Sequence, residues 1–148
     1  MAWNETPITV VGYVVADVTH RQTSEGVSVS NFRIASTERR YNKQTQDWED
    51  GDRLFLGVVC WRRLADNASA TLAKGDPVLV HGRLRNRFQE VDGQRRQFYE
   101  IEAVSLGVDL GRCHTLLNAP DASALVVPRT EDESVTVACQ AESETIPF

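Results

Sequence analysis

The first part of the chain alternates apolar and polar residues with a period of two, which predicts β-strands rather than helices. Residues 8–15 and 27–35 are rich in β-branched side chains and are expected to form the first two strands. Gly12 interrupts the first strand, as at a bulge or a sharp bend where a side chain would not fit. In the second strand, Phe32 and Arg33 are expected on opposite faces, one apolar and one polar.

Residues 54–61 have the clearest strand pattern, because successive side chains of a strand point to opposite faces. One face is expected to join the core and carries Leu54, Leu56, Val58 and Cys60. The other face carries Phe55, Gly57, Val59 and Trp61. In a domain of this size, two aromatic rings on one face must either be covered or be used for binding.

One helix is expected over residues 62–74, where Leu64, Ala68 and Leu72 recur every four residues before a Gly-Asp-Pro stop. The fourth strand, residues 78–87, again has two unlike faces. Its polar face carries His81, Arg83, Arg85 and Arg87, spaced about 6–7 Å apart along the strand. Together with the aromatic face of the preceding strand, this row is expected to line a common cleft.

Residues 38–52 are polar, hold Tyr41 and Trp48, and are expected to form a long hairpin loop that extends from the sheet as an arm. A tight-turn signal at residues 92–93, Asp-Gly, precedes a fifth strand at residues 97–104. Three strands, one helix and two further strands are the succession of an oligonucleotide/oligosaccharide-binding (OB) fold. The predicted class is therefore all-β with one helix, a five-stranded OB-fold barrel with a long β-hairpin arm.

The charge of the chain is distributed unevenly. Residues 1–111 hold 14 Lys or Arg against 15 Asp or Glu, whereas residues 112–148 hold 2 against 6. The net charge of −5 excludes a uniformly basic nucleic-acid-binding protein, although positive groups can still gather on one face. The last segment also has too little apolar sequence to offset the entropy of ordering. We expect an OB domain at residues 1–111 and an acidic, disordered tail at residues 112–148.

Several classes of protein are excluded by what the sequence lacks. No segment approaches the roughly 18 apolar residues of a membrane helix, and residues 1–20 lack a signal-peptide pattern, so a cytoplasmic protein is expected. The three cysteines, Cys60, Cys113 and Cys139, are too widely spaced for a zinc or redox pair and are interpreted as reduced thiols. His81 has no accompanying nucleophile or acid, and the strand faces offer no carboxylate cluster for a metal ion. We expect no catalysis, metal or cofactor.

Single-stranded nucleic acid presents phosphates and unpaired bases, which arginines and aromatic rings bind without reading sequence. The rings expected to stack on bases are Trp61, Phe55, Trp48, Tyr41 and Phe88, with Tyr99 as an alternative to Phe88. The side chains expected to bind phosphates are Arg33, Arg39, Arg40, Arg83, Arg85 and Arg87. Each feature has a plainer interpretation: a ring such as Trp61 can belong to a core or subunit interface, and an arginine row can be a solvated sheet face.

Four short segments carry a resemblance to a known family. They are 31–35 (NFRIA), 64–68 (LADNA), 74–78 (KGDPV) and 82–85 (GRLR). Over about residues 5–110 the chain resembles the bacterial single-stranded DNA-binding protein family, and within it the shorter second paralogue that some bacteria carry. The resemblance implies a homotetramer around which single-stranded DNA wraps during replication, recombination and repair.

The resemblance also implies roles for individual residues. Phe55, Trp61 and Phe88 would occupy the family's base-stacking regions, and the arm from Tyr41 to Trp48 would contribute to the binding groove. Many members carry a tryptophan at the position of Arg40, so one stacking platform is absent here, although Tyr41 can take its place.

The end of the chain resembles the family's docking tip, which binds basic, apolar pockets on partner proteins. It consists here of Glu144, Ile146, Pro147 and Phe148, with Thr145 in place of an acid and fewer acids than is usual. The alternative is an inert disordered end. An acidic tail can also compete with phosphate for the arginines.

The function expected from the sequence is non-enzymatic, sequence-tolerant binding of single-stranded DNA at the nucleoid. The protein would protect exposed strands and recruit replication and repair proteins through its tip. The alternative from another class is a protein-interaction module that assembles complexes through Phe148 and binds nucleic acid weakly.

Overall fold

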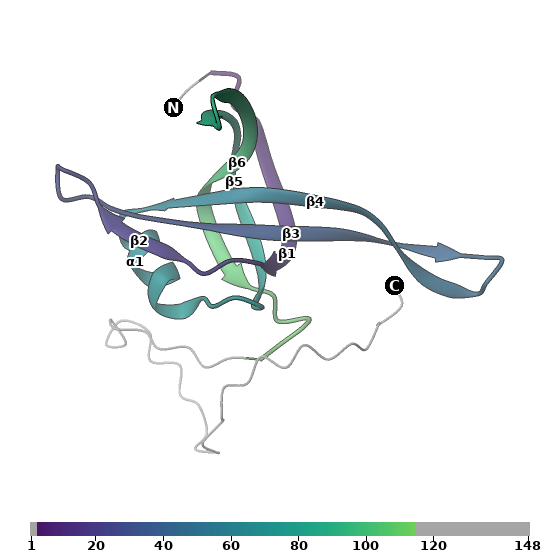
Figure 1. Cartoon of the computed structure of the whole chain (residues 1–148). Helices are drawn as coiled ribbons and strands as arrows, with labels where there is room; N and C mark the ends of the chain where they lie inside the picture. The colour runs from purple at the N-terminus through teal and green to yellow at the C-terminus, as the bar shows by residue number, and fades with distance from the viewer. Residues whose placement is uncertain (1–2, 115–148) are drawn as a thin grey trace, which may run out of the picture. The chain divides into compact units, whose positions relative to one another are not determined.

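The structure, a computed structural model, describes residues 3–114 (Figure 1). Its elements are β1 (Pro7–Val14), β2 (Thr19–Gln22), β3 (Ser28–Asn42), β4 (Asp47–Trp61), α1 (Arg62–Thr71), β5 (Pro77–Val91) and β6 (Gln94–Val108). The described residues up to Asp109 belong to one compact unit. Within this part of the chain, no helix is both long and apolar enough to cross a membrane. The predicted tail beyond residue 114, with Cys139 and the tip residues, lies outside the described residues.

Five of the strands close into a ring. Neighbouring strands follow the order β1-β5-β6-β4-β3, and β1 also pairs with β3 through Tyr13 opposite Ala35. All of these neighbours are antiparallel except β4 and β6, which run parallel where Val58 lies opposite Ile101. The ring, with one helix between β4 and β5, agrees with the predicted OB fold.

The core lies inside the ring and is covered at one end by the helix. The fully buried aliphatic side chains come from all five strands of the ring and include Val14, Ile34, Val58, Val78, Val80 and Ile101. From α1, Ala65 and Ala68 are buried against them. Burial raises the pKa of the Cys60 thiol to about 11, so this thiol stays protonated at neutral pH.

Leu54 departs from the predicted core face of its strand. Leu56, Val58 and Cys60 are buried as predicted, but Leu54 is 49% exposed. It lies opposite Ser36, where β3 and β4 leave the ring and continue as a two-stranded ribbon (Figure 1). Leu54 points to the same side of β4 as Leu56, as predicted. It is exposed because the buried core does not extend as far as this residue.

The arm is a hairpin as predicted, but the prediction that residues 38–52 form a loop is wrong. The β3–β4 ladder continues through this segment as far as Asn42 opposite Asp47, with one irregularity between Thr37 and Arg39. Charged pairs across the ribbon hold it, and the shortest joins Arg39 to Asp50 at 2.7 Å. Cross-strand ion pairs and one aromatic pair, Tyr41 with Trp48, take the place of a buried apolar face here.

Two further elements differ from the predicted pattern. The strand β2 has four exposed residues and no apolar alternation, and it forms by pairing with the start of β3. The helix ends at Thr71 instead of residue 74, because the amide of Ala73 donates to the carboxylate of Asp76 at 2.8 Å in a turn that replaces a further helical turn.

The turn between β5 and β6 confirms the Asp-Gly prediction. Asp92 and Gly93 both have positive φ, 53° and 74°, as a two-residue type I′ hairpin requires. Val91 consequently lies directly opposite Gln94, and both strands extend to the turn.

Gly82 is required by a close backbone approach at the bulge between β5 and β6. A Cβ at this position would meet the carbonyl oxygen of Glu102 and lie 2.9 Å from the Cα of Ala103.

We predict that Gly82→Ala lowers the free energy of unfolding by about 1–3 kcal/mol, measured by urea denaturation. Gly107→Ala is the matched control, because nothing lies within 4 Å of a Cβ there. Equal stability of both variants and the wild type would contradict the close approach.

Candidate nucleic-acid interface

The outer face of the ring brings together strands that are not consecutive in sequence. The order across it is β3, β4, β6 and β5, so β6 lies between the predicted aromatic face and the predicted arginines. Phe55 and Trp61 come from β4, as the alternation predicted. Glu100 and Glu102 of β6 lie beside Gly57 and Val59 of β4 and opposite the arginines of β5. The expected common cleft is therefore divided by a strand that carries two carboxylates.

The arginine row of β5, which is Arg83, Arg85 and Arg87, is bound to these carboxylates. Register places Arg83 opposite Glu102 and Arg85 opposite Glu100. Arg85 contacts Glu100 at 2.6 Å and Glu102 at 2.9 Å, and Arg83 contacts Glu102 at 2.7 Å. The hydrogen bond and the charge of Glu102 raise the pKa of Arg83 above its ordinary value. A phosphate at Arg83 or Arg85 would have to compete with a carboxylate.

Arg87 is the loosest member of the arginine row. Its guanidinium lies 3.7 Å from Glu100 and its side chain is half exposed. Glu100 itself is only 6% exposed, and Arg85, which contacts it directly, supplies the hydrogen bonds that its buried carboxylate needs.

The arm places two of its predicted functional rings together and pairs its predicted arginines with acids. Tyr41 and Trp48 face each other across the ribbon, with ring centroids 5.5 Å apart in an edge-on arrangement. Arg39 is bound to Asp50. Arg40 donates to Glu38 at 2.9 Å, and these contacts raise the pKa of Arg40 and lower that of Glu38.

Two of the predicted stacking rings each carry a guanidinium. Arg33 lies over Phe55 at 5.4 Å from the ring centroid, and Arg95 lies over Phe88 at 4.2 Å. Neither arginine has an ion-pair partner among residues 3–114. Arg95 is not among the phosphate ligands predicted from the sequence. The Asp-Gly turn could have predicted this contact from the sequence. A two-residue hairpin fixes the register of β5 and β6, and that register brings residue 95 near residue 88.

Phe88 and Trp61 occupy two different settings. Phe88 is about half exposed, and strand alternation places it on the side of β5 opposite the arginine row. Tyr99, the predicted alternative to Phe88, is also about half exposed. Trp61 is partly buried at the end of β4, where it lines a pocket beside the turn between β2 and β3.

His81 takes part in a simple polar contact, with Nδ1 2.8 Å from the hydroxyl of Thr9. Within the described part of the chain, no three His, Cys, Asp or Glu side chains gather where they could hold a metal ion. The chemistry that this face offers is stacking and hydrogen bonding with charged groups.

A closed ring of five strands with one helix between β4 and β5 defines the OB-fold class of protein. A family model described as the single-strand binding protein family matches residues 6–109. The chain therefore belongs to that family, which confirms the resemblance seen in the sequence.

Individual relatives agree with this membership. The chain is 50% identical over 111 residues to a single-stranded DNA-binding protein of Corynebacterium glutamicum, and the match covers 74% of this chain and 49% of the relative. It is 42% identical over 107 residues to single-stranded DNA-binding protein 2 of Streptomyces coelicolor, covering 72% of this chain and 54% of the relative. The match thus spans about half the length of these two relatives.

Two solved structures are similar to the fold. The small single-stranded DNA-binding protein from Streptomyces coelicolor is 41% identical with a TM-score of 0.68, and the match covers 74% of this chain and 98% of that one. The second single-stranded DNA-binding protein from Mycobacterium smegmatis is 32% identical with a TM-score of 0.61, covering 78% and 99%.

The contacts of Arg85 predict that it stabilises the fold. We expect Arg85→Ala to lower the free energy of unfolding by about 1–3 kcal/mol, because the buried carboxylate of Glu100 loses its closest donor. Arg87→Ala is the matched control on the same strand and should cost less than about 1 kcal/mol. Urea denaturation of both variants measures the difference. Equal losses would show that Glu100 does not depend on Arg85.

Proposed function

We propose that this protein binds single-stranded DNA without sequence specificity and protects it, with no catalytic step. The observation that carries the proposal is the outer face of β4, where Phe55 is 46% exposed and has Arg33 over its ring. A base can stack on such a ring whatever its identity, because every base has a π-face. The neighbouring guanidinium can bind the phosphate that follows the base.

The remaining predicted contacts extend the path of the strand. Trp61 continues the stacking face along β4, Tyr41 and Trp48 offer rings on the arm, and Phe88 offers one near the second hairpin. Among the predicted phosphate ligands, Arg33 and Arg87 need the least rearrangement. Arg39, Arg40, Arg83 and Arg85 would exchange a carboxylate for a phosphate, which yields less net binding energy than a free guanidinium does.

We also propose that the chain assembles as a homotetramer. An apolar patch, defined here as Val11, Leu79 and Val104, lies on the outside of the ring. Val11 is directly opposite Leu79, and Val104 is 72% exposed. Val104 lies at the bulge of β6, between the partners of His81 and Gly82, so only Val11 and Leu79 are direct neighbours. Exposed aliphatic side chains of this kind are typical of a surface that another subunit covers.

The proposed partners are replication, recombination and repair proteins, which the tip at Glu144, Ile146, Pro147 and Phe148 would bind. The tip lies outside the described residues, so this part rests on the sequence alone. The protein would then act in the cytoplasm at the nucleoid. The second candidate, an interaction module with weak DNA binding, gains some support from the pairing of Arg83 and Arg85 with carboxylates.

The DNA-binding proposal predicts an effect of Phe55→Ala. We expect this change to weaken binding of labelled oligo(dT) about five- to tenfold, the lower part of the range for loss of one stacking ring. Fluorescence anisotropy measures the affinity, which should also fall as salt rises from about 50 to 200 mM. A chain that lacks residues 146–148 is the control and should bind oligo(dT) unchanged. Absence of oligo(dT) binding at low salt would favour the interaction module.

The assembly proposal predicts an effect of charge in the apolar patch. The wild type should have the mass of four chains in light scattering, whereas Leu79→Asp and Val104→Asp should give smaller species, because a carboxylate would be desolvated in the interface. Leu54→Asp, at an exposed leucine outside the patch, is the control and should keep the wild-type mass. Unchanged mass in both patch variants would place the interface elsewhere.

A further inference from the structure

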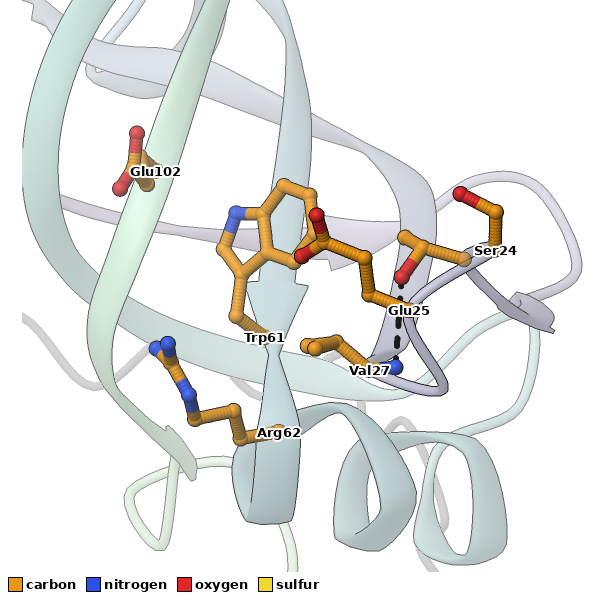
Figure 2. A pocket seen from close by; sticks show the side chains of 7 residues that line it. Ser24, Glu25, Val27, Trp61, Arg62 and Glu102 are labelled. Atoms are coloured by element: carbon orange, nitrogen blue, oxygen red, sulfur yellow. Dashed lines mark hydrogen bonds between the residues drawn. The ribbon is translucent and has the colours of Figure 1, made fainter.

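A pocket of about 400 Å³ opens between the turn after β2, the end of β4 and the middle of β6 (Figure 2). The residues that line it are Thr23, Ser24, Glu25, Val27, Trp61, Arg62 and Glu102. Trp61 lies between the turn and β6, with Arg62 next to it at the start of α1. The volume is at the small end of the range for ligand sites, and is enough for one planar heterocycle on the indole.

The charged groups of this pocket are not equivalent. Glu102 is committed to Arg83 and Arg85 through its Oε2 atom. Glu25 and Arg62, by contrast, have no ion-pair partner among the described residues. The pocket therefore offers one aromatic ring, one uncommitted carboxylate and one uncommitted guanidinium.

The backbone at Arg62 is strained. Its φ is 59°, in the left-handed region that a residue with a long side chain rarely adopts. This conformation lies at the junction where β4 passes into α1 without an intervening loop. Strain of this kind costs on the order of 1–3 kcal/mol and is concentrated at functional sites.

The charges of the pocket favour a base over a phosphate. A phosphate would pair with Arg62 but would be repelled by Glu25, whereas a base can donate to the carboxylate of Glu25 and accept from the guanidinium of Arg62. Guanine has two adjacent donors, N1–H and the N2 amino group, which match the two oxygens of one carboxylate. Its O6 and N7 atoms accept from an arginine. Adenine, cytosine and thymine each lack the pair of adjacent donors.

We propose that this pocket is a guanine-preferring subsite of the single-strand interface, in which a base stacked on Trp61 donates to Glu25 and accepts from Arg62. The inference rests on the proposed binding of single-stranded DNA. It adds one selective position to a face that otherwise tolerates any sequence.

The test compares labelled oligonucleotides of equal length built from the repeats TTG, TTA and TTC, in lithium buffer to disfavour guanine quadruplexes. By fluorescence anisotropy, the full chain should bind the TTG strand about fivefold more tightly than the other two, the lower end expected for one bidentate contact. Replacing guanine with inosine, which lacks the N2 amino group but keeps N1–H, O6 and N7, should weaken the preference.

Variants of the pocket residues test whether the guanine preference arises in this pocket. Glu25→Gln should bring the ratio of TTG to TTA affinity close to one, and should leave the inosine strand bound as tightly as the guanine strand. Asp17→Asn is the matched control, since it removes a charge from an exposed carboxylate outside the pocket and should keep the wild-type ratio.

The outcomes separate this inference from the proposed function. Equal affinity of the wild type for all three strands, or a preference that survives Glu25→Gln, overturns the guanine subsite while DNA binding stands. Failure to bind any strand at low salt overturns both.

Discussion

The parallel pairing of β6 with β4 determines how the outer face of this protein is organised. It closes the ring of strands, and it inserts Glu100 and Glu102 between the aromatic residues of β4 and the arginine row of β5. Because Glu100 is buried, its charge requires a close donor, and Arg85 supplies it. One long-range strand pairing thus decides which guanidinium groups hold the fold together and which remain available to a ligand.

The sequence was sufficient to predict features that depend on a single strand or a single turn. Alternation placed Phe55 and Trp61 on one side of their strand and Leu56, Val58 and Cys60 on the other, because a period of two is a local property of an extended chain. The Asp92-Gly93 turn was predicted for the same reason, since both residues tolerate positive φ better than most others do and the pair is favoured in two-residue hairpins.

The features that were missed depend on partners distant in sequence. Nothing local shows that β6 lies between β4 and β5, so the arginines were expected beside the aromatic rings. Leu54 repeats the pattern of Leu56 but lies beyond the end of the ring. The arm has no apolar alternation, so its strands were not predicted. Complementary charges on either side of the turn, such as Arg39 and Asp50, were the pattern that could have indicated strand pairing.

The guanidinium groups stacked on Phe55 and Phe88 have a consequence for how a strand would arrive. Any planar group that approaches Phe88 from the side of Arg95 meets the arginine first, 4.2 Å above the ring. A base that stacks on that side must displace Arg95 from the ring. The guanidinium then lies beside the backbone of the bound strand and no longer contacts Phe88. The base would take the place of the arginine on the ring, and the displaced guanidinium would remain close enough to pair with the backbone phosphate of the same strand.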